Sequence, residues 1–114
     1  MKTLSRAHLT EKERRSIEEA ARRLKSELPV SRVVLFGSKA RGTAAVDSDI
    51  DLLVLTSSAV TATLRRQISD RIFDVNLEND VVLCSIVVSE QEWSEGLIRH
   101  MLIHSEVERD GCEV

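Results

Sequence analysis

The sequence predicts an α/β (α+β) fold in which a small mixed sheet is flanked by helices. Three short runs rich in Val, Leu and Ile have the length of buried strands. The segments between these runs repeat apolar residues at helical spacing, so the order along the chain is α-β-α-β-α-β-α. A chain of 114 residues is long enough for one domain with one core. We expect this domain at residues 10–111, after a flexible lead-in at 1–9.

Local signals bound each element in turn. Thr10 and Glu13 form a capping box, and Pro29 stops the first helix. Ser57-Ser58 precede the second long helix, and Ser89 with Glu92 opens the last one. The predicted elements are a helix at about 11–27, a strand at 31–36, a short helix from Ser38 to just before Gly42, a loop at 42–47, a strand at 49–55, a helix at 59–78, a strand at 81–88, a helix from about 90 to 104, and a polar, acidic end.

Residues 37–51 carry the pattern that points to chemistry. Gly37-Ser38 follows the first strand directly, and Asp49-Ile50-Asp51 opens the second strand. Side chains at i and i+2 of a strand point the same way, so Asp49 and Asp51 lie close enough to hold one hard cation. Gly37 lets the backbone approach a phosphate, and Ser38 offers its hydroxyl and N–H. On its own the dipeptide fits an ordinary strand-to-helix turn, but with the Asp pair it predicts a site for a magnesium-bound nucleotide.

Composition and charge restrict the remaining classes of function. Hydrophobic residues make up 42% of the chain, and no apolar stretch approaches the roughly 20 residues of a membrane helix. We expect a cytoplasmic protein with no disulfide, and with Cys84 as a buried thiol. Residues 1–41 carry a net charge of +6 and residues 42–114 one of −9. The basic part fits attraction of polyphosphate, RNA or an acidic partner, or simply a solvated helix face. With only three aromatic residues, nucleic acid is an unlikely ligand.

The pattern resembles the nucleotidyltransferase superfamily of DNA polymerase β. It is most similar to the small MNT group, the minimal nucleotidyltransferases, many of which are antitoxins paired with HEPN-domain ribonuclease toxins. The resemblance covers about residues 10–111 and implies a polymerase-β-like nucleotidyltransferase palm fold. The residues that carry it are Gly37-Ser38, Ala40-Arg41-Gly42 and Ser48-Asp49-Ile50-Asp51-Leu52, with a strand on either side.

The resemblance also implies roles for individual residues. Asp49 and Asp51 match the catalytic carboxylates that hold one or two Mg²⁺ ions, with ATP as substrate. Gly37, Ser38 and Arg41 match positions that bind the nucleotide phosphates. Lys39 fits the same role, and it equally fits an exposed, solvated lysine. Ser48 is expected to brace the turn, and Asp47 to be a loop residue or a ligand through water.

One carboxylate of the family pattern is missing. Active members carry a third Asp on the next strand, facing the pair, where it is the candidate base for the incoming hydroxyl. The strand at 81–88 holds no acidic residue, and we expect Ser85 at that position. Serine is a poor base and a weak metal ligand, so transfer would depend on activation by the metal alone.

Two functions of different classes follow. The first is a magnesium-dependent protein adenylyltransferase of the MNT antitoxin type. It would move AMP from ATP to a hydroxyl of a HEPN toxin and so neutralise it, in a hetero-oligomer. The second is a non-catalytic antitoxin that neutralises its partner by binding, with a vestigial nucleotide site. A stripe of Trp93, Leu97 and Met101 on the last helix fits either a docking face or core packing, and His100 and His104 share the i, i+4 spacing of metal ligands.

Overall fold

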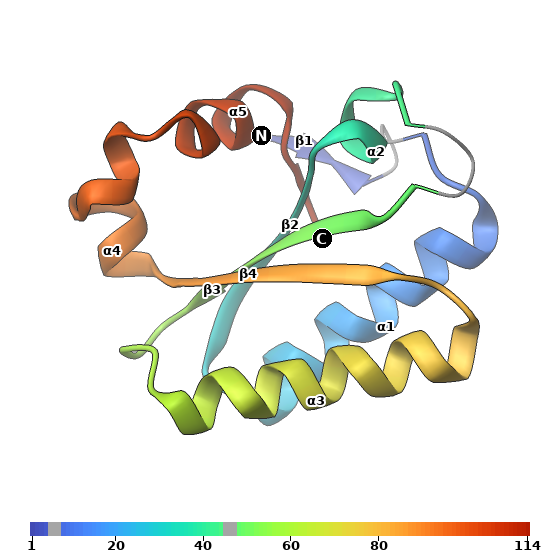
Figure 1. Cartoon of the computed structure of the whole chain (residues 1–114), viewed down its shortest axis with the longest axis horizontal. Helices are drawn as coiled ribbons and strands as arrows, with labels where there is room; N and C mark the ends of the chain where they lie inside the picture. The colour runs from blue at the N-terminus through green and yellow to red at the C-terminus, as the bar shows by residue number, and fades with distance from the viewer. Residues whose placement is uncertain (5–7, 45–47) are drawn as a thin grey trace.

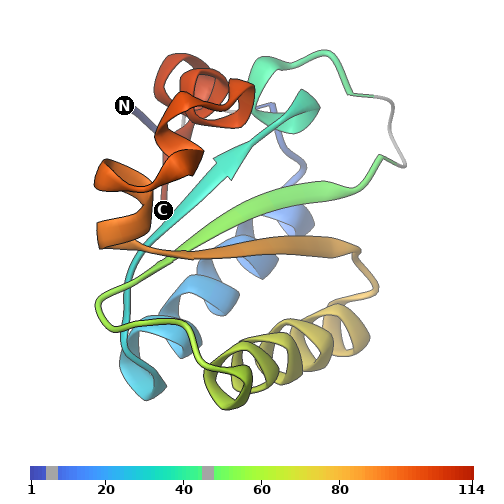
Figure 2. The ribbon, with the colours of Figure 1, turned by 60° about the vertical axis from the view of Figure 1, so that its left-hand side comes forward.

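The computed structural model describes residues 1–4, 8–44 and 48–114 and shows a five-stranded sheet between two layers of helices (Figures 1 and 2). The predicted loop at 42–47 is described only as far as residue 44, and Asp47 lies outside the described residues. The elements are β1 (Lys2–Thr3), α1 (Glu11–Glu27), β2 (Val30–Phe36), α2 (Ser38–Arg41), β3 (Ile50–Thr56), α3 (Ala62–Asn79), β4 (Leu83–Ser89), α4 (Glu90–Glu95), the 3-10 turn η2 (Leu97–His100), α5 (Leu102–Asp110) and β5 (Cys112–Glu113).

The sheet has the strand order β1-β5-β2-β3-β4. The central pair β2 and β3 is antiparallel, and it aligns Phe36 with Asp51. Strands β3 and β4 are parallel because α3 carries the chain back between them, and their register aligns Asp51 with Cys84. Strand β5 joins β2 in antiparallel fashion and β1 in parallel. This order confirms the predicted mixed sheet and places the start of β3 beside the end of β2.

Alternating side chains give each face of the sheet its own apolar cluster. Odd-numbered residues of β2, such as Val33, and even-numbered residues of β3, such as Leu52, pack against α1 and α3. Their neighbours Val34 and Leu53 point to the opposite face, where α4 and α5 contribute Trp93 and Val107. Residues buried on both faces explain why β2 and β3 read as continuous apolar runs.

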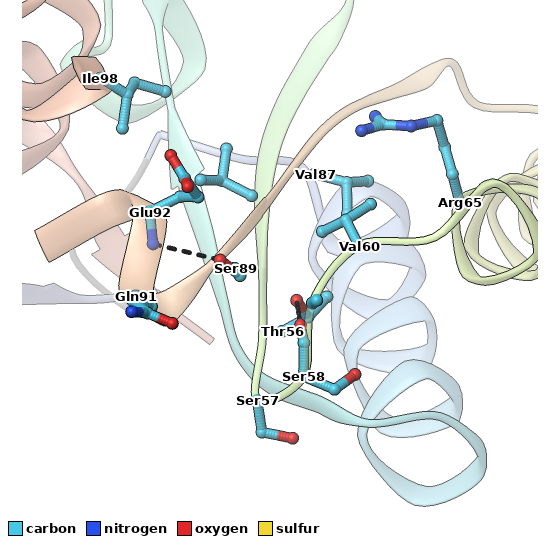
Figure 3. A pocket seen from close by; sticks show the side chains of 12 residues that line it. Thr56, Ser57, Ser58, Val60, Arg65, Val87, Ser89, Gln91, Glu92 and Ile98 are labelled. Carbon is cyan, nitrogen blue, oxygen red and sulfur yellow. Dashed lines mark hydrogen bonds between the residues drawn. The ribbon is translucent and has the colours of Figure 1, made fainter. Parts of the chain in front are cut away.

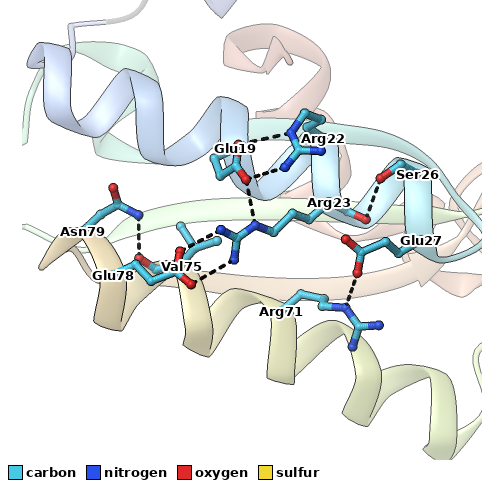
Figure 4. Close-up of polar contacts among 9 residues, drawn as sticks. All are labelled: Glu19, Arg22, Arg23, Ser26, Glu27, Arg71, Val75, Glu78 and Asn79. Atoms are coloured by element: carbon cyan, nitrogen blue, oxygen red, sulfur yellow. Dashed lines mark hydrogen bonds and ion pairs between the residues drawn. The ribbon is translucent and has the colours of Figure 1, made fainter.

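Helices α1 and α3 lie side by side, and ion pairs cross their outer surface (Figure 4). The guanidinium of Arg23 contacts Glu78 of α3 at 2.6 Å and Glu19 of its own helix at 2.8 Å. Arg71 of α3 reaches back to Glu27 at 2.8 Å. Part of the positive charge of the N-terminal region is therefore neutralised within the molecule.

The first helix matches its prediction in both bounds and cap. Thr10 Oγ1 accepts a hydrogen bond from the N–H of Glu13, and Glu13 Oε1 accepts one from the N–H of Thr10. For the second long helix the predicted cap was wrong, because Thr61 rather than Ser57-Ser58 caps α3. The N–H of Ser57 binds the carbonyl of Pro29 instead, so this segment still belongs to the turn after β3.

The C-terminal region differs most from its prediction. The helix expected at about 90–104 breaks at Gly96, where an added Cβ would meet the Glu92 carbonyl at 2.7 Å, and the chain continues as η2 and α5. The segment after α5 forms β5, and Lys2–Thr3, expected in a loose lead-in, pair with it as β1. Two-residue strands carry too little pattern to be recognised from sequence. None of the described helices is long and apolar enough to cross a membrane.

Candidate nucleotide and metal site

The turn between β2 and α2 is held against the carboxylate of Asp51. Gly37 has φ +77° and ψ −158°, a conformation that residues with a side chain rarely adopt. A Cβ atom added to Gly37 would lie 2.5 Å from Asp51 Oδ2. Glycine is therefore needed for two reasons, the backbone angle and the space. The Gly37 turn and the Asp51 carboxylate, both singled out from the sequence, are therefore in direct proximity.

Asp49 and Asp51 point to the same face of the sheet, as alternation predicts. Asp49 lies just before β3 and is exposed, whereas Asp51 is half-buried inside the strand. Burial and the neighbouring charge of Asp49 raise the pKa of Asp51, and the positive charge of Arg41 opposes this effect. Two carboxylates that repel each other beside a cation are a suitable place for a divalent metal ion.

The residues of α2 divide between the site and the interior. Ser38 is half-buried at the start of the helix, and Arg41 is exposed at its end. Lys39 is buried, with its ammonium 2.7 Å from Glu13 Oε2. The alternative interpretation from the sequence, in which Lys39 is an exposed, solvated side chain, is therefore wrong. The sequence pattern identifies Glu13 only as part of a capping box. Its ion pair with Lys39 depends on the tertiary structure.

Cys84, not Ser85, lies opposite the Asp pair on β4. The register pairs Cys84 with Asp51, and its Sγ lies 3.7 Å from Asp49 Oδ2. Ser85 pairs with Leu52, whose side chain belongs to the opposite face of the sheet. Cys84 is also exposed, so the expected buried thiol was wrong. A shift of one residue along a strand exchanges the two faces, and the sequence did not define that register.

The donor set fits magnesium bound together with a nucleotide. Among the described residues no group of three or more His, Cys, Asp and Glu side chains is placed to hold a metal ion. Magnesium commonly binds through one or two carboxylates and completes its shell with water and substrate phosphates. The hard oxygen atoms of Asp49 and Asp51 suit this arrangement, and the thiol of Cys84 adds no hard donor to it.

The C-terminal residues considered as a docking stripe do not share one face. Trp93 is 3% exposed and belongs to the core, whereas Leu97 and Met101 are 84% and 58% exposed. The ring of Trp93 stacks on His104 at a centroid distance of 4.4 Å. His100 lies in η2 and His104 in α5, so they are not successive turns of one helix. The break at Gly96 removes the continuous helical spacing that the stripe and the histidine pair shared in the sequence.

A separate cavity of about 470 Å³ opens at the other end of the sheet (Figure 3). It lies where β3 and β4 end, about 20 Å along the strands from the Asp pair. The charged residues that line it are Arg65 and Glu92. Ser89 at its edge caps α4 by accepting a hydrogen bond from the N–H of Glu92 at 3.1 Å. The chemistry of this lining is less specific than that of the Asp pair, so the Asp pair is the candidate functional site.

Residues 17–108 match the family model of the nucleotidyltransferase domain, and the chain therefore belongs to this family. The match includes the Gly37-Ser38 turn, both aspartates and Cys84. No curated protein matches the chain in sequence.

Solved structures with the same fold are found among toxin–antitoxin complexes. A toxin–antitoxin structure with AMP-PNP superposes with a TM-score of 0.59 at 17% identity, over 91% of this chain and 72% of that one. A MntA–HepT complex gives 0.55 at 15% identity, over 88% and 69%. A complex of a tri-AMPylated HEPN toxin with an MNT antitoxin, from Shewanella oneidensis, gives 0.54 at 16% identity, again over 88% and 69%. At these identities the likeness establishes the fold.

Proposed function

We propose that this chain is an antitoxin-type protein adenylyltransferase. It would transfer AMP from magnesium-bound ATP to a hydroxyl of a partner protein, a HEPN ribonuclease toxin, and thereby neutralise it. The observation that carries the proposal is the contact between the Gly37 turn and the Asp51 carboxylate, with Asp49 on the same face. It brings a phosphate-binding turn and a metal-binding pair to one place in a chain of the nucleotidyltransferase family.

Each site residue has a role in this proposal. Asp49 and Asp51 hold one or two magnesium ions and are the catalytic carboxylates. Gly37 and Ser38 receive the phosphates at the turn, and exposed Arg41 supplies positive charge beside them. The ammonium of Lys39 is paired with Glu13, so in this proposal Lys39 holds the turn in place and does not contact the phosphates itself. Magnesium, when bound, would neutralise charge on the triphosphate.

The reaction is a displacement at the α-phosphorus of ATP. The oxygen of the acceptor hydroxyl forms a bond to this phosphorus, the bond to the bridging oxygen breaks, and pyrophosphate leaves. The hydroxyl proton passes to a carboxylate of the pair or to water. The protein contributes mainly position and charge, which is what phosphoryl transfer requires.

Cys84 occupies the position opposite the Asp pair where a general base would speed the transfer of AMP. The side chain of Cys84 is exposed, but partial desolvation at the sheet surface and the nearby charges of Asp49 and Asp51 raise the pKa of its thiol. A raised pKa makes the thiol a poor candidate for the base. The same observation favours the second candidate, a non-catalytic antitoxin that works by complex formation with a vestigial nucleotide site. Transfer and simple binding therefore have to be separated by experiment.

The proposed partner rests on the structural neighbours and on the surface of the molecule. The neighbouring structures are complexes of toxins with antitoxins. Leu97, Met101 and Leu102 expose large apolar side chains on the C-terminal helices, which a partner protein would cover. We also propose a cytoplasmic location. The use of ATP as substrate is consistent with it, and so are the free thiols of Cys84 and Cys112.

The deciding experiment follows label from α-labelled ATP with Mg²⁺ onto a co-expressed HEPN partner. The Asp49→Asn/Asp51→Asn protein is compared with Asp70→Asn/Asp74→Asn, which removes two exposed charges from α3. We expect labelled partner with the wild type and the α3 variant, and none with the site variant. An inhibited, unlabelled partner in an intact complex would establish the binding-only function instead.

A further inference from the structure

Helix α2 depends on tertiary contacts for its position. It is a single turn of four residues, too short to be stable alone. One contact is Ala40, which is 2% exposed in the core between the sheet and α1. A second is Gly42, which has φ +79° and, because it lacks a Cβ, leaves room for the ring of His8. The third is the buried ion pair of Lys39 with Glu13.

Glu13 uses both of its carboxylate oxygens. Oε1 accepts a hydrogen bond of 2.9 Å from the N–H of Thr10, which closes the cap of α1. Oε2 lies 2.7 Å from the ammonium of Lys39, two residues after Gly37. The two residues are 8% and 5% exposed. One side chain therefore ties the start of α1 to the helix that follows the phosphate-binding turn.

We infer that Glu13 is a positioning residue of the nucleotide site, which fixes the Gly37–Ser38 turn relative to Asp51 by holding Lys39. This inference rests on the proposed function, because it concerns how well that site binds a nucleotide. Loss of the paired carboxylate leaves the charge of a buried ammonium less well compensated, and this favours a shift of the ammonium away from its present position. Lys39 is part of α2, so its movement displaces the turn.

Glu13→Gln is the direct test, because glutamine keeps an acceptor for the N–H of Thr10 and removes only the charge that faces Lys39. Glu11→Gln is the matched control, with the same change of charge in the same turn of α1 at an exposed position. Ala20→Gly weakens α1 at a buried site away from its start and controls for lost stability. Calorimetry with Mg²⁺ and AMP-PNP measures affinity at a temperature where every variant is folded.

We expect Glu13→Gln to weaken AMP-PNP binding about tenfold, and both controls to bind like the wild type. The amide NMR signals of Gly37 and Ser38 should shift in Glu13→Gln and stay in place in Ala20→Gly. Glu13→Gln/Lys39→Met should bind no more weakly than Lys39→Met, because the two residues act as one unit.

Wild-type affinity in Glu13→Gln, or an equal loss in Ala20→Gly, would overturn this inference and leave the proposed function standing. Tighter binding by Glu13→Gln would overturn it too, since Lys39 released from Glu13 would then contact the phosphates itself. A wild type that binds no AMP-PNP would overturn the proposed function together with the inference.

Discussion

Asp51 meets two opposing demands at the residue scale. In the proposed function it must be ionised to hold a cation, yet burial and the charge of Asp49 raise its pKa. A carboxyl group whose pKa is raised in the folded state binds its proton more tightly there. The folded, metal-free protein therefore loses stability as the pH rises through that pKa. Such a cost is common where a side chain is placed for function rather than for packing.

Cys84 offers a test of catalysis at a single residue. In Cys84→Asp a third carboxylate would face Asp49 and Asp51, and it could accept the proton of the incoming hydroxyl. We expect the initial rate of AMP transfer to rise about tenfold or more. We also expect metal-free stability to fall by about 1 kcal/mol, because three like charges then repel each other. Transfer of label at limiting protein and urea unfolding measure the two effects.

Ser85→Asp is the control for that substitution. It adds the same charge one residue further along β4, on the opposite face of the sheet. The transfer rate should not increase in this variant. A gain with Ser85→Asp and none with Cys84→Asp would show that the register between β3 and β4 is not the one described here.

At the level of secondary-structure elements, the turn between β2 and α2 requires a backbone conformation at Gly37 that other residues rarely adopt. Gly37→Ala places a side chain at φ +77° and pushes a methyl group toward Asp51 Oδ2. We expect the free energy of unfolding to fall by about 1–3 kcal/mol. AMP-PNP binding should be lost because the carboxylate has to move. Urea unfolding and calorimetry measure the two effects separately.

Gly37→Ala/Asp51→Ala separates the causes of the stability loss. Removal of the carboxylate relieves the steric contact but leaves the unfavourable backbone angle. If the double variant is as unstable as Gly37→Ala, the backbone angle dominates. If Gly37→Ala has wild-type stability, the turn does not have the conformation described here.

At the scale of the whole molecule, Glu90 connects the C-terminal helices to the sheet. Its carboxylate binds the guanidinium of Arg32 on β2 at 2.9 Å and accepts a hydrogen bond of 2.7 Å from Ser31. The hydrogen bond from Arg32 lowers the pKa of Glu90 against the effect of burial. At Glu13 burial raises the pKa, and hydrogen bonds from Lys39 and Thr10 outweigh it, so this pKa is also lowered.

These two carboxylates predict sensitivity to acid. Their pKa values in the folded state lie below the ordinary value of 4.5, so they stabilise the protein above that pH and lose this effect as the pH falls. We expect the free energy of unfolding to decrease from about pH 5 downward. Glu90→Gln should lower it by about 0.5–1 kcal/mol at pH 7, with a shallower decline in acid.

Urea unfolding between pH 3 and pH 7 tests this prediction. Glu92→Gln changes an exposed carboxylate on the same helix and should follow the wild-type profile. A Glu90→Gln profile parallel to that of the wild type would mean that the pair with Arg32 contributes nothing to acid sensitivity.

Local patterns in the sequence predicted the two long helices, the three long strands and the proximity of Asp49 to Asp51. These features follow from local rules: apolar periodicity, capping residues and the alternation of side chains along a strand. The capping box at Thr10 and Glu13 fixed the start of α1 to the residue. The break at Gly96 was missed because an isolated glycine within a helical pattern is often tolerated.

The residues that surround the candidate site depend on contacts between segments that are distant in the sequence. The register of β4 against β3 placed Cys84 beside the carboxylates and turned Ser85 away. The packing of α1 against α2 buried Lys39 on Glu13, 26 positions earlier in the chain. The small strand β5 forms by pairing with β2, and β1 forms by pairing with β5. Register, ion pairing and edge pairing join distant segments, and no local pattern specifies them.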